Sequence, residues 1–262
     1  MSTSCQYTTD FFQSIRASSS QSAAVVVPLL IDLIHPTSVI DIGCGPGTWL
    51  HEFENQGVAD ILGVDGDYVA PSLLQIPQPL FISHDLRNLF SAPRQFDLAL
   101  CLEVAEHLPA ECADVLIDSL VRLAPVVAFS AAVPHQGGTD HRNEQWPEYW
   151  AAKFQARGFV SIDYLRPRIW NNDDVAWWFA QNMILYVEEG HLHQTRELTS
   201  LVDLQNGKPL SLVHPRCYLG TVTSADKRVK AEQNPGVVEA ARRFFAAGAK
   251  SLRSRLKANA NR

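Results

Sequence analysis

Val-Ile-Asp-Ile-Gly-Cys-Gly-Pro-Gly-Thr-Trp-Leu, residues 39–50, is the stretch that decides the fold. It joins an apolar run to a turn with Gly43, Gly45 and Gly47, and then to an amphipathic segment. Glycines at this spacing allow a tight turn and let a ligand approach the backbone without interference from Cβ atoms. The stretch therefore predicts a strand, a glycine-rich binding turn and a helix.

The same alternation extends along most of the chain. From residue 23 to residue 190, short apolar runs alternate with amphipathic stretches, the pattern of βα units around a mostly parallel sheet. We predict strands at Ser38–Ile42, Asp60–Val64, Leu80–Ile82, Phe96–Cys101, Val126–Ala131, Phe159–Tyr164 and Met183–Val187. The clearest helices are predicted at Gln21–Ile34, Thr48–Asn55, Glu111–Leu123 and Gln145–Arg157. The fold class is α/β, with a Rossmann-like, seven-stranded, mostly parallel sheet and helices on both faces.

Beyond residue 190 the alternation ends. We therefore expect one domain over residues 1–190, with a possible lid in residues 1–22, and a C-terminal extension over 191–262. Leu201–Tyr218 contains Gly207, Pro209 and Pro215 and is predicted to be loop. Pro235 suits the first turn of a basic helix over Gly236–Leu256.

The charge is distributed unevenly. The net charge is −6, but residues 226–262 hold 10 Lys and Arg against 3 Asp and Glu, whereas residues 1–225 hold 12 against 25. An acidic body argues against a general nucleic-acid binder. The basic tail is expected to be an exposed amphipathic helix, with a docking arm for an acidic surface as the alternative.

Composition and termini indicate a cytosolic globular protein. An apolar content of 46% over 262 residues excludes overall disorder. The apolar run 23–34 is interrupted by Pro28 and Asp32 and is too short to cross a bilayer, so no membrane span is predicted. Residues 1–9 lack the features of a secretory signal. The five scattered cysteines, without a C-x-x-C pair, are expected to be reduced.

The glycine turn distinguishes between two nucleotide cofactors. A dinucleotide-binding turn has a third glycine where this chain has Thr48. Asp41 precedes the first glycine by two positions, and a carboxylate there would repel a pyrophosphate. Beside an ammonium group the same carboxylate is favourable. The turn therefore suits S-adenosylmethionine (SAM) better than NAD.

Two further carboxylates follow predicted strands. Asp65 ends the second strand and can accept hydrogen bonds from both ribose hydroxyls of a nucleoside. Asp85 follows the third strand and can accept from an adenine amino group, with Leu86 packing on the ring. The end of the fourth strand is expected near the methionine moiety.

This ordered set resembles the class I SAM-dependent methyltransferases over residues 20–190. The resemblance implies SAM as methyl donor and S-adenosylhomocysteine as product. It implies a cofactor site built from Asp41, Gly43, Cys44, Gly45, Gly47, Trp49, Asp65, Gly66, Asp85, Leu86 and Leu102.

The segment after the fourth strand reads Glu103-Val-Ala-Glu106-His107. It lacks the Asn/Asp-Pro-Pro-Tyr/Phe motif of methyltransferases that act on nucleic-acid amino groups, so DNA is not an expected partner. The string resembles that of ubiquinone-biosynthesis O-methyltransferases and of small-RNA 2′-O-methyltransferases. In the RNA group both glutamates and the histidine bind a divalent cation with a second histidine, which implies a possible cation at Glu103, Glu106, His107 and His141.

The alternative needs no metal. Similar strings occur in this superfamily without one, and His107 would then cap a helix or act alone as a base. The loop 134–141 adds His135 and His141, and we expect at least one of these three histidines to be catalytic.

Aromatic side chains near these loops are candidates for acceptor contacts. Trp146 and Trp150 lie one helical turn apart and could stack on a ring or sugar face. Tyr7 and Phe11 resemble the lid that many small-molecule methyltransferases fold over the cofactor. The alternatives are core packing for the tryptophans and an ordinary terminal helix for the N-terminal segment.

The sequence thus predicts a methyltransferase that acts on a small molecule, with a hydroxyl on a sugar-like or polyhydroxylated compound as the first choice. N-methylation of a small amine is the first alternative, because the acidic body attracts cations. A non-catalytic SAM-binding or scaffold protein is the second, and the three histidines argue against it.

Overall fold

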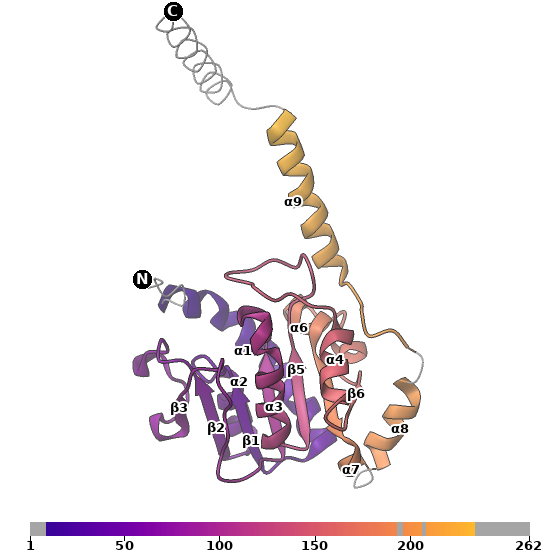
Figure 1. Ribbon diagram of the computed structural model, residues 1–262. Coiled ribbons are helices and arrows are strands. Elements are labelled where there is room, and N and C mark those ends of the chain that lie inside the picture. Colours follow the sequence, from indigo (N-terminus) through magenta and orange to yellow (C-terminus); the bar gives the residue numbers. More distant parts are fainter. Residues whose placement is uncertain (1–8, 193–195, 206–207, 234–262) are drawn as a thin grey trace, which may run out of the picture. The chain divides into compact units, whose positions relative to one another are not determined.

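The core of the protein is a seven-stranded sheet with the strand order β3-β2-β1-β4-β5-β7-β6 (Figure 1). The computed structural model describes residues 9–192, 196–205 and 208–233. Strand β7 is antiparallel to β5 and β6, and the remaining neighbours are parallel. The predicted sheet is confirmed, with strands β1 (Ser38–Ile42), β2 (Asp60–Asp65), β3 (Phe81–Ser83), β4 (Leu98–Leu102), β5 (Val126–Ser130), β6 (Phe159–Ile162) and β7 (Ile184–Glu188).

Helices cover both faces of the sheet. Val39 of β1 packs into the apolar layer under α1, whereas Ile40 and Ile42 pack into the layer under α3 and α4. The central strands β1, β4 and β5 are buried along their whole length, as expected for a parallel sheet covered on both sides. One face carries α1 (Thr9–Ile34), α2 (Thr48–Asn55), α5 (Arg166–Ile169), α6 (Trp177–Asn182) and α8 (Arg196–Gln205), and the other carries α3 (Ala113–Leu123) and α4 (Pro147–Gln155).

Short helical turns complete the loops at both ends of the strands. The most important is η3 (Ala105–His107), which directly follows β4 and carries two of the predicted site residues. The remaining short elements are η1 (Pro71–Leu73), η2 (Gln78–Leu80), η4 (Ala110–Cys112) and α7 (Glu189–Leu192).

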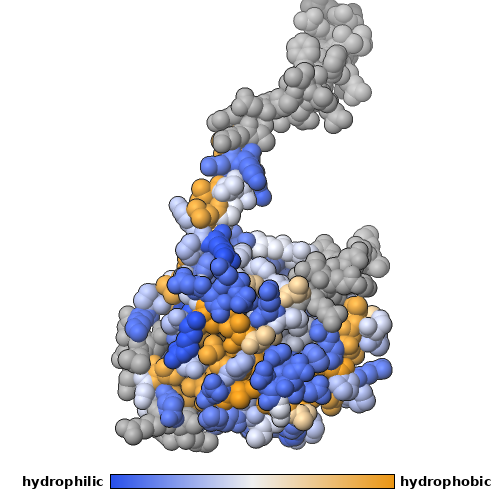
Figure 2. All heavy atoms as spheres, turned by 180° about the vertical axis from the view of Figure 1, so that it is seen from behind, coloured by the Kyte–Doolittle hydropathy of each residue, from blue (hydrophilic) through white to orange (hydrophobic). Residues whose placement is uncertain are grey.

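Helix α1 is half-buried against the sheet. Ala17–Ile34 has the length and hydropathy of a membrane span by composition alone, and one third of this window is buried. Its inner face is fully enclosed at Ala23, Val26 and Leu30. Val25, Leu29, Ile31 and Ile34 of α1 are only partly buried. On the face shown in Figure 2, apolar and hydrophilic residues are mixed. The packing of the inner face makes α1 a core helix of this fold.

The C-terminal part departs from the sequence prediction. Leu201–Tyr218 was expected to be loop, but α8 (Arg196–Gln205) covers its beginning and α9 (Pro215–Gln233) begins before its end. Leu198 anchors α8 in the core, and Pro215 occupies a first turn where its missing N–H is harmless. Of the described turn-forming residues, Pro209 lies between the two helices and Pro215 begins the second one.

The body of the protein extends further than residue 190. The compact unit is Met1–Cys217, and Tyr218–Arg262 forms a second unit. The described residues 196–205 and 208–217 therefore belong to the body, and α8 packs on β6. The helix predicted over Gly236–Leu256 lies outside the described residues.

Candidate active site

The glycine turn follows β1 and is held against β2. The backbone N–H groups of Gly43 and Cys44 donate to the carbonyl of Val64, at 2.7 and 3.2 Å. Gly43 has a φ of 83°, and a Cβ there would lie 2.3 Å from a methyl group of Val104. Only glycine fits this position, because both the backbone conformation and the contact exclude a side chain. The turn therefore presents bare backbone at the carboxyl end of the sheet.

Asp65 closes this turn from β2. One carboxylate oxygen accepts from the N–H of Gly45 and the other from the N–H of Gly66, both at 2.6 Å. The Tyr68 hydroxyl donates to the same oxygen as Gly66. Asp65 is 4% exposed, and burial raises its pKa although these donors oppose the effect. Sequence reasoning missed Tyr68, which occupies the place expected for a ribose hydroxyl.

Asp41 lies under the turn at the end of β1. It is 2% exposed, and burial, together with the charge of Asp65, raises its pKa to about 7. Burial and the same two carboxylates raise the pKa of the Cys44 thiol well above its usual value. An isolated carboxylate in this environment is stabilised by a cationic partner. The role of Asp41 beside an ammonium group stays a prediction.

Of the other predicted cofactor residues, Asp85 is paired with an arginine, and three apolar residues are buried. Both oxygens of Asp85 are held by Arg87, at 2.8 and 2.7 Å, and this guanidinium lowers the pKa of the carboxyl group. Leu86 and Leu102 are largely buried, near the loop after β3 and at the end of β4. Trp49 packs edge-on against a phenylalanine of α6 in the core. Arg87 is a partner of Asp85 that sequence reasoning did not anticipate.

The E-x-x-E-H string forms the turn from β4 into η3. Glu103 has a φ of 55°, uncommon for a residue with a side chain, and its N–H donates to the carbonyl of Ser130 at 3.0 Å. Its carboxylate accepts from Asn182 at 3.1 Å and from Gln136 at 3.3 Å. The left-handed backbone turns the chain sharply at the strand end, and two amide side chains hold the carboxylate.

Glu106 is fully buried beside Glu103. Neither carboxylate oxygen of Glu106 accepts a well-formed hydrogen bond within the described part of the chain. Burial and the neighbouring charge of Glu103 raise the pKa of Glu106 well above its usual value, and nearby backbone N–H groups offset this only in part. Burial likewise raises the pKa of Glu103. A buried carboxylate without strong donors is costly unless a proton or a cation neutralises it.

Two histidines complete the cluster. Ligand atoms of Glu106, His107 and His141 all lie within 4.8 Å of one another, and the two imidazole rings are 4.9 Å apart. The loop between β5 and α4, which carries His141, is attached to η3, because the carbonyl of Glu106 accepts from the N–H of Arg142 at 2.7 Å. Burial, then the charge of His141, lowers the pKa of His107 to about 4. His107 is therefore neutral across the physiological range.

Glu144 organises the histidine loop. Its carboxylate accepts from the backbone N–H groups of His135 and Gly137, both at 2.8 Å. The same carboxylate lies 2.9 Å from Nδ1 of His141. Sequence reasoning missed Glu144, and its spacing of three residues from His141 was the available signal. This contact leaves Nε2 as the nitrogen of His141 that can bind a cation.

The remaining predicted residues are not all brought to this cluster. His135 is exposed and lies outside the group of three. Trp150 is 2% exposed and packs on Phe129 in the core, so its predicted contact with an acceptor has no support in this structure, whereas Trp146 is 41% exposed. Tyr7 and the side chain of Phe11 lie outside the described residues.

The sheet order, the glycine turn at β1 and the carboxylate at the end of β2 define a class I SAM-dependent methyltransferase. A family model for a methyltransferase domain matches residues 14–181, more than half of the chain. The chain belongs to this methyltransferase domain family. No curated protein sequence matches it.

Solved structures of methyltransferases share the fold. The sugar N-methyltransferase KedS8 from Streptoalloteichus sp ATCC 53650 is 16% identical, with 72% of this chain and 95% of that chain covered and a TM-score of 0.53. SAM-bound CalS10 from Micromonospora echinaspora, an amino pentose methyltransferase, is 17% identical, with 71% and 100% covered and a TM-score of 0.50. At these identities the likeness shows the fold alone.

Proposed function

We propose that this methyltransferase transfers the methyl group of SAM to a hydroxyl of a small polyhydroxylated acceptor, at a site that holds a divalent cation. The observation that carries the proposal is the fully buried carboxylate of Glu106, which lacks a well-formed hydrogen bond and faces two imidazoles. Carboxylate oxygens and neutral imidazole nitrogens are ligands suited to Mg²⁺, Mn²⁺ or Fe²⁺.

The protonation of His107 favours ligation over general-base catalysis. An imidazole must be neutral to bind a metal, and a pKa of about 4 keeps His107 neutral at any physiological pH. A general base works best with a pKa near the working pH, which is well above that value. Burial therefore makes His107 a poor proton acceptor and a ready ligand.

Glu106, His107 and His141 would hold the cation, and Glu144 would orient His141 through its Nδ1 contact. Glu103, which is held by two amides, adds negative charge beside this set. A divalent cation supplies Lewis acidity that makes a nearby hydroxyl easier to deprotonate and can align two neighbouring hydroxyls.

The cofactor half of the site follows from the two buried aspartates. Asp41 would accept from the ammonium group of SAM, which would offset the burial and the charge of Asp65 that raise its pKa. Asp65 would accept from the ribose hydroxyls. Tyr68 is 38% exposed, and its hydroxyl is the side-chain donor that would leave Asp65 when the ribose arrives.

The test is methyl transfer with and without metal. After EDTA treatment, transfer to polyhydroxylated acceptors should be lost and should return with Mg²⁺, Mn²⁺ or Fe²⁺. Glu106→Gln and His141→Ala should each lose activity about 10²-fold or more while SAM affinity is retained. Glu111→Gln is the matched control, because that glutamate is exposed on η4.

Full activity of the metal-free enzyme in EDTA would contradict the cation hypothesis. General-base catalysis by a histidine would then remain as the explanation. A methylated amine as the product would favour the second candidate, a small-amine N-methyltransferase. That candidate draws support from the acidic body, in which 25 acidic residues face 12 basic ones over residues 1–225.

A further inference from the structure

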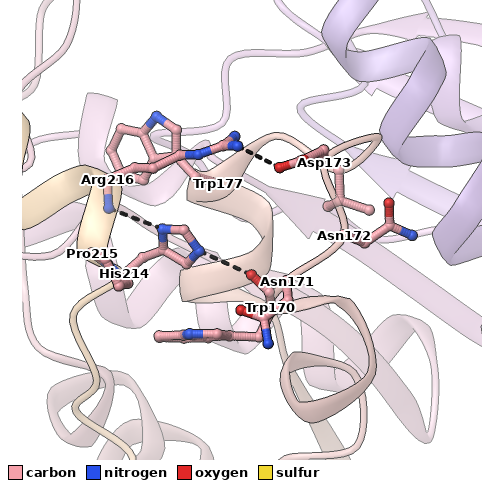
Figure 3. A pocket seen from close by; sticks show the side chains of 9 residues that line it. Trp170, Asn171, Asn172, Asp173, Trp177, His214, Pro215 and Arg216 are labelled. Atoms are coloured by element: carbon pink, nitrogen blue, oxygen red, sulfur yellow. Dashed lines mark hydrogen bonds and ion pairs between the residues drawn. The ribbon is translucent and has the colours of Figure 1, made fainter.

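A small pocket lies between the loop that joins α5 to α6 and the start of α9. It has a volume of about 220 Å³ and is lined by two indoles, Trp170 and Trp177, together with polar side chains (Figure 3). All its lining residues belong to the compact unit Met1–Cys217. Neither the predicted cofactor site nor the cation cluster includes any of them.

The pocket has no net charge. Arg216 forms an ion pair with Asp173 across its mouth. Both ring nitrogens of His214 are engaged, because Nε2 lies 2.9 Å from the carbonyl of Trp170 and Nδ1 accepts from the N–H of Arg216 at 3.2 Å. Neither ring nitrogen is therefore left to meet a charged ligand. The pocket therefore suits an uncharged ligand.

The walls match the chemistry of a sugar ring. Indole faces pack against apolar C–H faces, and indole N–H groups donate hydrogen bonds. Around them, Arg216 supplies donors, Asp173 supplies acceptors, and the side chain of Asn172 supplies both. A hydroxyl group needs both a donor and an acceptor. An anion would be repelled by Asp173, and a cation would be repelled by Arg216. The side chains labelled in Figure 3 place these groups around one space.

The pocket is joined to the active site by a chain of side-chain hydrogen bonds. Gln181 accepts from the N–H of His214 at 2.8 Å and donates to Asn182 at 2.9 Å. Asn182 in turn donates to the carboxylate of Glu103 at 3.1 Å. A ligand in the pocket therefore contacts a wall that is tied to the end of β4, where the acceptor is expected.

We propose that this pocket binds one neutral sugar ring of the acceptor, so that a part of the substrate that is not methylated is held here. The inference rests on the proposed function for the identity of the acceptor, but the binding itself is independent of methyl transfer. Contacts with a remote part of a substrate supply the binding energy that orients the reacting group.

The experiment titrates full-length protein with the methyl glycopyranosides of glucose, galactose, mannose and xylose, using calorimetry and saturation-transfer NMR. Inorganic phosphate and ethanolamine serve as charged controls. Saturable glycoside binding is expected, with a dissociation constant that rises at least about tenfold in Trp177→Ala and in Asp173→Ala. Asp173 has a side chain 86% exposed, so its replacement leaves the fold intact. Leu89→Ala removes an exposed apolar side chain outside the pocket and should change nothing.

Each variant is also titrated with SAM, so that loss of the fold is distinguished from loss of the pocket. The inference is overturned if no glycoside binds, if phosphate or ethanolamine binds instead, or if glycoside binding survives in both pocket variants. Glycoside binding that depends on Trp177 and Asp173, without any methyl transfer, would uphold the pocket and count against the proposed function.

Discussion

At the scale of single residues, the active site contains carboxylates that the fold does not stabilise. Glu106 has a pKa raised above its ordinary value of 4.5 by burial and by Glu103. In the unfolded chain it ionises near 4.5, whereas in the folded protein it retains its proton to higher pH. The protonated carboxyl group of Glu106 therefore makes its full contribution to the free energy of unfolding below about pH 4.5. This contribution is lost as pH rises through the folded-state pKa.

Glu106→Gln should consequently stabilise the metal-free protein at alkaline pH. One unit of difference between the folded and unfolded pKa values corresponds to about 1.4 kcal/mol, so the variant should unfold at higher temperature than the wild type at pH 8 and by a smaller margin at pH 5. Calorimetric scans of both proteins in EDTA measure this. A variant that is less stable at pH 8 would show that Glu106 has a strong partner.

Asp41 predicts how cofactor binding depends on pH. Its pKa of about 7 means that below this pH the folded protein must release a proton before the carboxylate can accept from an ammonium group. SAM affinity should therefore weaken by up to about tenfold per pH unit below 7. Asp41→Asn should bind SAM more weakly than the wild type at pH 8 and lose this pH dependence. Calorimetric titrations at several pH values decide it, and a wild-type affinity that is flat from pH 5 to 8 would remove Asp41 from the cofactor site.

At the scale of elements, η3 and the loop after β5 form one structural unit. The loop is bound to η3 through the carbonyl of Glu106, and Glu144 gathers three groups of the loop on one carboxylate. The cation site is therefore distributed over two segments that depend on each other. Loss of the Glu144 carboxylate should change the orientation of His141, although every proposed cation ligand is still present.

Glu144→Ala should reduce Mn²⁺ affinity about 10- to 100-fold, the usual cost of removing the partner of a metal-binding histidine. SAM affinity should not change, because the cofactor residues lie on β1 and β2. Calorimetric titration with Mn²⁺ and then with SAM measures both, and Glu111→Ala serves as the control on an exposed glutamate. Unchanged Mn²⁺ binding in Glu144→Ala would show that the loop holds His141 in place without the Glu144 carboxylate.

At the scale of the whole molecule, the sequence predicted what depends on local pattern. The turn after β1 and helix α2 appear at the predicted residues because glycine spacing and apolar periodicity are local signals. Glu106, His107 and His141 come together because strand ends of a parallel sheet share one edge. Gln181 escaped prediction because its hydrogen bond joins α6 to His214, and only packing brings these two segments together. Glu144 was missed although its spacing of three residues from His141 is a local signal.

The division into two compact units gives a prediction for truncation. The buried core residues of the described part lie at or before Cys217, so a chain that ends there should keep its melting temperature and SAM affinity. Thermal unfolding and calorimetry of the truncated and full-length chains make the comparison. A large drop in melting temperature would show that residues after Cys217 stabilise the body.

The strand order has a consequence for how such an enzyme diversifies. The chain leaves β1 for β2 and β3 on one side and returns to β4, β5, β7 and β6 on the other. The residues predicted to bind the cofactor lie mainly in the first half, and the proposed cation ligands lie in the second. Mutation and selection can therefore remodel the segments after β4 while the half proposed to recognise the methyl donor stays unchanged. New substrates become accessible by drift in one half of the gene, without a period in which donor recognition is lost.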